Sequence, residues 1–190
     1  MRIVEIQIEG VTAYSQSKLV DPDLFPRKEK EGHDEYDKRV WREKSTFNAK
    51  GEVCIPAMSL KMATDEAIKR LSLSIPGRKS TTYTKFFLAG QICEADVPIG
   101  VMKADLEYVD IWANADGIRG SNKRVRRRFP YIPHWSGVAR FAILDDVIPS
   151  AIFERAFVEA GRLIGIGRFR PEKGGYLGRY AVGKFKWSEV

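Results

Sequence analysis

The strongest constraint on the fold is an apolar stripe in residues 149–164. Apolar side chains recur there at intervals of three and four residues, at Ile152, Phe153, Ala156, Phe157, Ala160, Leu163 and Ile164. This spacing predicts an amphipathic helix with one wide apolar face. Asp145 and Asp146 stand just before it, where acidic residues mark a helix entry. A helix with so wide an apolar face is expected to pack on a sheet.

Strand patterns surround this helix. Apolar and polar residues alternate in 2–13 and again in 135–144, and a closing strand is expected in 176–187. Further elements are expected in between, namely a strand at 52–56, a helix at 57–73, a loop at 72–84, a strand at 85–93 and one or two strands at 97–113. This order predicts an α+β, ferredoxin-like or RRM-like fold, in which two helices cover one face of an antiparallel sheet. The open face of such a sheet is a common platform for single-stranded RNA.

The chain length of 190 residues predicts one domain, 1–190, with two long insertions. The first insertion is expected at about 15–50, which carries 17 charged side chains and one helical stretch near 34–44. The second is expected at about 76–130 and contains a basic loop.

The composition excludes several classes of protein. Apolar residues make up 44% and aromatic residues 11% of the chain, which is too much for a disordered protein. No apolar run approaches the roughly 20 residues of a membrane helix, and the N-terminus lacks the apolar core of a signal peptide. Cys54 and Cys93 have no neighbouring histidine or third cysteine, so we expect two small buried thiols and no zinc site. A cytoplasmic protein is predicted.

The positive charge is concentrated in one segment. The chain has a formal net charge of +7, and residues 117–144 hold seven basic and no acidic side chains. Phe129, Tyr131, His134 and Trp135 follow directly. Arginine and lysine neutralise phosphates, and each base stacked on an aromatic ring contributes roughly 1–3 kcal/mol. The predicted ligands of single-stranded nucleic acid here are Arg119, Lys123, Arg124, Arg126, Arg127, Arg128, Tyr131 and Trp135. The alternative is a solvated basic loop followed by core aromatics.

A glycine-rich stretch follows the expected helix. It contains no G-x-x-x-x-G-K-[ST] motif, and the glycines at 165 and 167 lack the third glycine of a dinucleotide fingerprint. The pattern instead indicates a loop whose amides and cations approach a polyanion. The glycines concerned are Gly165, Gly167, Gly174, Gly175 and Gly178, and the predicted ligands are Arg168, Phe169, Arg170, Lys173 and Arg179. A helix C-cap followed by a hairpin turn is the alternative, and both can hold together.

The pattern G-x-G-R-F-R-P-x-x-G-G-x-x-G-R at residues 165–179 resembles the terminal loop of the RAMP superfamily of CRISPR-associated proteins. Residues 55–61, IPAMSLK, resemble the turn into the first helix of the CRISPR effector backbone subunit. The resemblance covers 1–13, 52–73 and 136–187, and the two insertions resemble RNA-gripping loops. It implies an RRM-like fold and backbone binding of single-stranded RNA, with a filament as one form of assembly. The short chain also resembles small phage proteins, which indicates a phage-encoded relative.

Catalysis is not expected. RAMP endonucleases commonly use a histidine as general acid or base, but His33 lies in the charged insertion and His134 stands between Pro133 and Trp135 without a second histidine. The paired Asp145 and Asp146 are better explained by the helix entry than by a metal. We therefore predict no catalytic residue, no metal and no cofactor.

Four hypotheses follow. The leading one is a non-enzymatic RAMP-type protein that binds single-stranded RNA. If Arg126, Arg127, Arg128, Arg168 and Arg170 each contact a phosphate, the log-log salt slope of binding should be about −3.5. The others are a phage protein that binds or anneals single-stranded DNA, a mimic of a CRISPR subunit that joins or blocks the complex, and an RNA endonuclease that depends on His134. The expected partners are single-stranded RNA or DNA, further copies of the chain or CRISPR-complex subunits, and no membrane.

Overall fold

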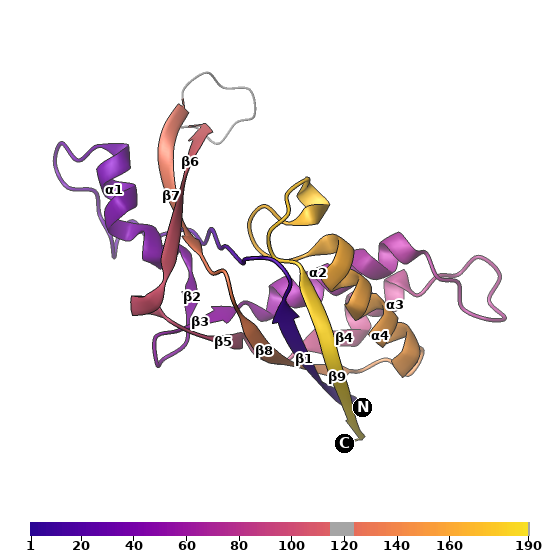
Figure 1. Ribbon diagram of the computed structural model, residues 1–190. Helices are drawn as coiled ribbons and strands as arrows, with labels where there is room; N and C mark the ends of the chain where they lie inside the picture. The colour runs from indigo at the N-terminus through magenta and orange to yellow at the C-terminus, as the bar shows by residue number, and fades with distance from the viewer. Residues whose placement is uncertain (115–123, 190) are drawn as a thin grey trace.

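A four-stranded antiparallel sheet forms the centre of the computed structural model, which describes residues 1–114 and 124–189 (Figure 1). Its strands lie in the order β4-β8-β1-β9. Their bounds are β1 Arg2–Gly10, β4 Gln91–Cys93, β8 Ser136–Ile143 and β9 Tyr180–Glu189. The first and last strands of the chain are neighbours, and the other two follow on the far side of β1. This is the order of a ferredoxin-like sheet, so the predicted fold class is confirmed.

Two helices, α2 (Ala57–Leu71) and α4 (Ser150–Glu159), pack on one face of this sheet (Figure 1). The last turn of α4 continues as a π-helical segment, Ala160–Ile164. The predicted apolar stripe faces the sheet, and Phe153 and Phe157 are fully buried against Phe141 of β8 at centroid distances of 5.4 Å. The core therefore lies between this helix pair and the sheet.

The other face of the sheet is the one that such folds commonly use as a platform for single-stranded RNA. The aromatic rings of β9 point to the helices, since Phe185 contacts Phe157 and Trp187 contacts Phe153. Among the described strands, the open face carries no aromatic ring and presents Glu5, Gln7, Glu9, Val138, Arg140 and Lys186. The described strands therefore offer no aromatic ring for base stacking on this face, and RNA binding to it stays a prediction. The strand register decides which side chains lie on this face, because side chains alternate between the two faces.

Most of the remaining elements lie in the chain between β1 and β8. The helix α1 (His33–Val40) and a 3-10 turn (Trp41–Lys44) fill the helical stretch predicted at 34–44. A second sheet contains β2 (Thr46–Phe47), β3 (Glu52–Ile55) and β5 (Val97–Met102). The strands β6 (Glu107–Asn114) and β7 (Arg124–Tyr131) form a separate two-stranded hairpin that projects from the body (Figure 1). Short 3-10 turns lie at Lys103–Asp105 and Pro171–Lys173.

Two sequence predictions in this region are wrong. The strand expected at 85–93 is mostly the helix α3 (Thr84–Gly90), and only Gln91–Cys93 is extended. Short apolar runs do not distinguish a buried strand from a buried helix, and here Phe87 is buried with its ring stacked near Phe153. The basic run expected as a loop is largely the strand β7. Within the described residues, no helix is long and apolar enough to cross a membrane.

Candidate nucleic-acid interface

The glycine-rich segment 165–179 forms a compact loop between the π-helical turn and β9. Gly165 caps the turn, and Gly165, Gly167, Gly174 and Gly178 all have positive φ angles. Gly167 has a second reason to be glycine, because a Cβ there would come within 2.4 Å of the Ser15 carbonyl oxygen. The next amide, that of Arg168, donates to the same carbonyl at 2.8 Å. The loop is therefore fastened to the chain that leaves β1.

Arg168 is the most unusual cation of this loop. Its guanidinium lies 3.2 Å from the ring centroid of Phe129 and 4.5 Å from that of Phe169. Burial, followed by the nearby charge of Arg127, lowers the pKa of Arg168 to about 10. Within the described residues, this guanidinium has neither a hydrogen-bond acceptor nor an ion-pair partner. A half-buried cation with open donors is suited to bind an anion.

A cleft of about 420 Å³ lies beside Arg168. It is bounded by the segment 17–20, by α1 and by the hairpin, and it contains the cations Lys18, Lys44, Arg127 and Arg168 with the single carboxylate Asp37. The fold thus brings together cations from four separate parts of the chain.

Two further hollows continue this cleft along the glycine-rich loop. One of about 450 Å³ shares Lys18 and Arg168 with the cleft and reaches Ser59 and Arg170. The next, of about 300 Å³, shares Ser59 and Arg170 and reaches Lys173 at its end. Because neighbouring hollows share lining residues, we treat all three as one groove, called the loop groove below.

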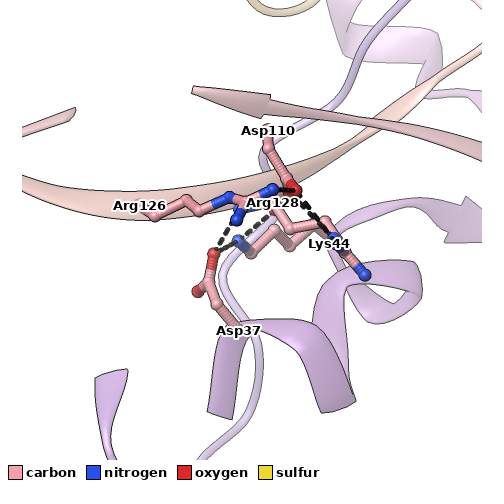
Figure 2. A network of polar contacts seen from close by, with 5 residues as sticks. All are labelled: Asp37, Lys44, Asp110, Arg126 and Arg128. Carbon is pink, nitrogen blue, oxygen red and sulfur yellow. Dashed lines mark hydrogen bonds and ion pairs between the residues drawn. The ribbon is translucent and has the colours of Figure 1, made fainter. Parts of the chain in front are cut away.

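Asp37 ties α1 to the free edge of β7 (Figure 2). Its carboxylate accepts from Lys44 Nζ at 2.7 Å and from the Arg128 backbone N–H at 2.7 Å, and lies 3.6 Å from the Arg127 guanidinium. Lys44 also donates to the Arg128 carbonyl oxygen at 2.6 Å, and burial lowers its pKa. The ion pair thus satisfies both outward backbone groups of Arg128. A two-stranded hairpin is marginal alone, so this edge contact explains how it is held.

Asp110 of β6 engages two of the predicted phosphate ligands (Figure 2). Arg128 contacts both oxygens of its carboxylate, at 2.8 and 2.9 Å, and Arg126 contacts one at 2.6 Å. The hydrogen bonds from Arg128, and then those from Arg126, lower the pKa of Asp110 to about 2. Arg128 also stacks on Tyr108 at 3.6 Å. Its side chain is therefore part of the hairpin structure, and a phosphate contact from it stays a prediction.

The remaining predicted site residues are dispersed. Trp135 lies in the core, where its ring contacts Tyr14 and its indole N–H donates to the Thr12 carbonyl at 2.9 Å. No face of its ring is open to a base, which corrects its predicted stacking role. Arg119 and Lys123 lie outside the described residues.

Of the others, Arg124 and Phe169 are exposed and Tyr131 is partly buried. Arg170 and Lys173 each pair with Glu172 at 2.8 Å. The Arg179 guanidinium donates to the Arg162 carbonyl.

Sequence reasoning missed three residues of this region. Lys18 and Lys44 reach the loop groove from the charged insertion, and nothing local distinguishes them from the other cations there. Trp112 of β6 is 68% exposed. Its signal is its alternation with Asp110 in a strand, which is visible only once the hairpin is recognised. Among the residues that the structure describes, no group of three or more histidines, cysteines or carboxylates is placed to hold a metal.

Comparisons with known proteins support the fold. No family model matches the chain, and no curated protein matches it. Among solved structures, it is similar to a chain of the type III-B Cmr-beta complex bound to cognate target RNA, with a TM-score of 0.54 and 12% identity. That match covers 99% of this chain and 61% of the other, so this chain spans about three fifths of its relative's length.

Two further solved structures are more distant. One is Cmr6 from Pyrococcus furiosus, with a TM-score of 0.47 and 11% identity, and the match covers 95% of this chain and 98% of the other. The second is a CRISPR protein from Archaeoglobus fulgidus, with a TM-score of 0.42 and 12% identity, and the match covers 100% of this chain and 65% of the other. The fold comparison rests on the Cmr-beta chain, and it supports the RAMP-like fold that the sequence predicts.

Proposed function

We propose that this chain binds single-stranded RNA along the loop groove, without reading its sequence and without catalysis. The observation that carries the proposal is the half-buried guanidinium of Arg168, which has open donors in a groove rich in cations. The protein also shares its fold with a chain of a complex whose structure contains target RNA. The RNA backbone would run from the hairpin past the glycine-rich loop toward α2.

The groove suggests which groups contact phosphate. Lys18, Arg127 and Arg168 line its first part, and Arg170 lines the second. Four phosphate contacts to a single strand give a log-log salt slope of about −3, or roughly a 50-fold loss of affinity between 50 and 200 mM salt. This slope is shallower than the value of about −3.5 expected from the sequence, because Arg126 and Arg128 do not line the groove and only Lys18 is added.

An anisotropy titration across a salt series tests the proposal. Single-stranded RNA, single-stranded DNA and duplex DNA of one length would be compared, with RNA expected to bind tightest. The variant Arg168→Gln should weaken binding and make the slope shallower by about 0.7. Arg155→Gln removes the same charge from an exposed position on α4 that does not line the groove, and should bind like the native protein. Equal losses in both variants would refute a specific groove.

The other outcomes select the competing functions. Tighter binding of DNA would favour a phage protein that coats or anneals single strands. No binding of any strand at low salt would instead favour a mimic that joins or blocks a CRISPR complex. Labelled RNA should stay intact on long incubation with or without divalent metal, and cleavage lost in His134→Ala would contradict the non-enzymatic role.

A further inference from the structure

The β6–β7 hairpin has two chemically different faces. Arg127 and Phe129 belong to the face that lines the loop groove. The opposite face carries Tyr108, Asp110 and Trp112 from β6 with Arg126 and Arg128 from β7, and we call these five residues the outer hairpin face. Trp112 is 68% exposed and Tyr108 is 51% exposed. Large aromatic side chains are costly to leave in water, so a ligand that covers these rings would gain free energy from their burial.

The outer hairpin face has two exposed aromatic rings on β6, and β7 places an arginine near each of them. Arg128 stacks on Tyr108 at 3.6 Å, and Trp41 contacts the same ring at 5.4 Å. Arg126 lies directly across the strands from Trp112. Within the described part of the chain, no ring or cation stacks on Trp112. The Tyr108 ring is therefore already in contact with a cation and with another ring, whereas the Trp112 indole ring is open.

Asp110 holds the Arg126 side chain in place on the face that carries the open Trp112 ring. Its carboxylate holds the Arg126 guanidinium at 2.6 Å, while the Arg126 side chain stays 48% exposed. Because this guanidinium is already held on the same face as the open Trp112 indole, a flat group that contacts both costs little further ordering of the arginine. Nucleobases are such groups, because each has a π-face that stacks on an aromatic ring or an arginine plane.

We propose that the outer hairpin face binds a nucleobase, stacked on the Trp112 indole and flanked by Arg126, of the strand whose phosphates lie in the loop groove. This inference rests on the proposed function, since it assigns the bases of that strand a place. Both faces belong to the same two strands, so the inference requires a bound RNA strand long enough to contact both of them. The arginines on both faces favour a polyanion over an apolar protein surface.

The experiment compares Trp112→Ala with the native protein on two ligands of equal length, a single-stranded RNA and an abasic ribose-phosphate strand. Trp112→Ala should weaken binding of the RNA by about 5- to 150-fold, which corresponds to 1–3 kcal/mol for one stacked base. Its salt slope should not change, and its binding of the abasic strand should match that of the native protein. Trp112→Phe should recover most of the loss on RNA. Urea unfolding checks that the variants fold, as expected for so exposed a position.

The outcomes separate the two proposals. If the native protein binds RNA with the expected salt slope and Trp112→Ala binds it equally well, the base site is refuted and the proposed function stands. Equal weakening on the RNA and the abasic strand also refutes stacking. If the native protein binds neither strand, both proposals fail, and the outer hairpin face is then a surface for a protein partner.

Discussion

Replacing Arg168 with methionine should change the free energy of unfolding little but weaken RNA binding. The side chain of methionine keeps much of the packing on Phe129 and Phe169 but removes the charge. Two effects on stability then oppose each other. Removing a partly desolvated cation is favourable, whereas losing its stacking on the Phe129 ring at 3.2 Å is unfavourable. The expected net change is therefore small.

The magnitudes follow from the surroundings of Arg168. Burial lowers its pKa to about 10, and one pKa unit corresponds to about 1.4 kcal/mol. Solvent at the mouth of the cleft screens part of this cost, so we take about 1–2 kcal/mol. Because the folded pKa of this basic group is lowered, the charged form opposes folding at neutral pH, and the cost is relieved only above about pH 10. The lost cation–π contact costs about 0.5–2 kcal/mol, and the two effects cancel to within about 1.5 kcal/mol.

Binding should respond differently from stability. A charge-assisted hydrogen bond to phosphate contributes about 1.5–3 kcal/mol, so Arg168→Met should weaken RNA binding roughly 10- to 150-fold. Urea unfolding and anisotropy titration of the same preparations measure the two quantities. A variant destabilised by about 2 kcal/mol or more, with unchanged RNA affinity, would show that Arg168 is a structural residue and refute this reasoning.

Three further predictions concern the supports of the site. Asp37→Asn should destabilise the protein by about 3–5 kcal/mol in urea unfolding, because it leaves Lys44 buried without its carboxylate, and adding Lys44→Met should restore part of the loss. Gly175→Ala should lower the melting temperature more than Gly174→Ala, since a Cβ at Gly175 lies 1.9 Å from a backbone oxygen, whereas one at Gly174 meets nothing within 4 Å and has only the cost of the positive φ. Asp110 has a folded pKa lowered to about 2, so its stabilising effect is present above about pH 4 and is lost as the pH falls toward 2, and amide exchange of the hairpin should rise in that range.

The sequence predicted the sheet and the helices that cover it, because their signals are local. The alternation in β1 and β8 and the stripe of α4 each depend on neighbours within one element. The element order then leaves few topologies, and the ferredoxin-like order is one of them. By contrast, α3 was mistaken for a strand, because Phe86, Phe87 and Leu88 form too short a run to show a helical period.

The site was harder to predict because long-range contacts decide it. The run Arg126, Arg127 and Arg128 suggested three open phosphate ligands, yet Asp110 binds two of them from the facing strand, 16 and 18 residues away along the chain. Asp37 reaches β7 from a separation of 91 residues. No local pattern indicates such partners. Trp135 is a similar case, since its neighbours Tyr14 and Tyr180 come from the two ends of the fold.

These contacts change how the positive charge acts. A basic run in a flexible loop would bind any polyanion and would order itself only on binding. In this hairpin, Asp37 and Asp110 remove part of the charge but fix the positions of the cations that remain. Fewer phosphate contacts with less ordering cost predict a shallower salt slope without a matching loss of affinity. The Asp110→Asn variant distinguishes the two cases. If Asp110 only neutralises charge, the variant should bind RNA more tightly. If Asp110 positions Arg126 for the proposed base site, the variant should bind more weakly despite its higher net charge.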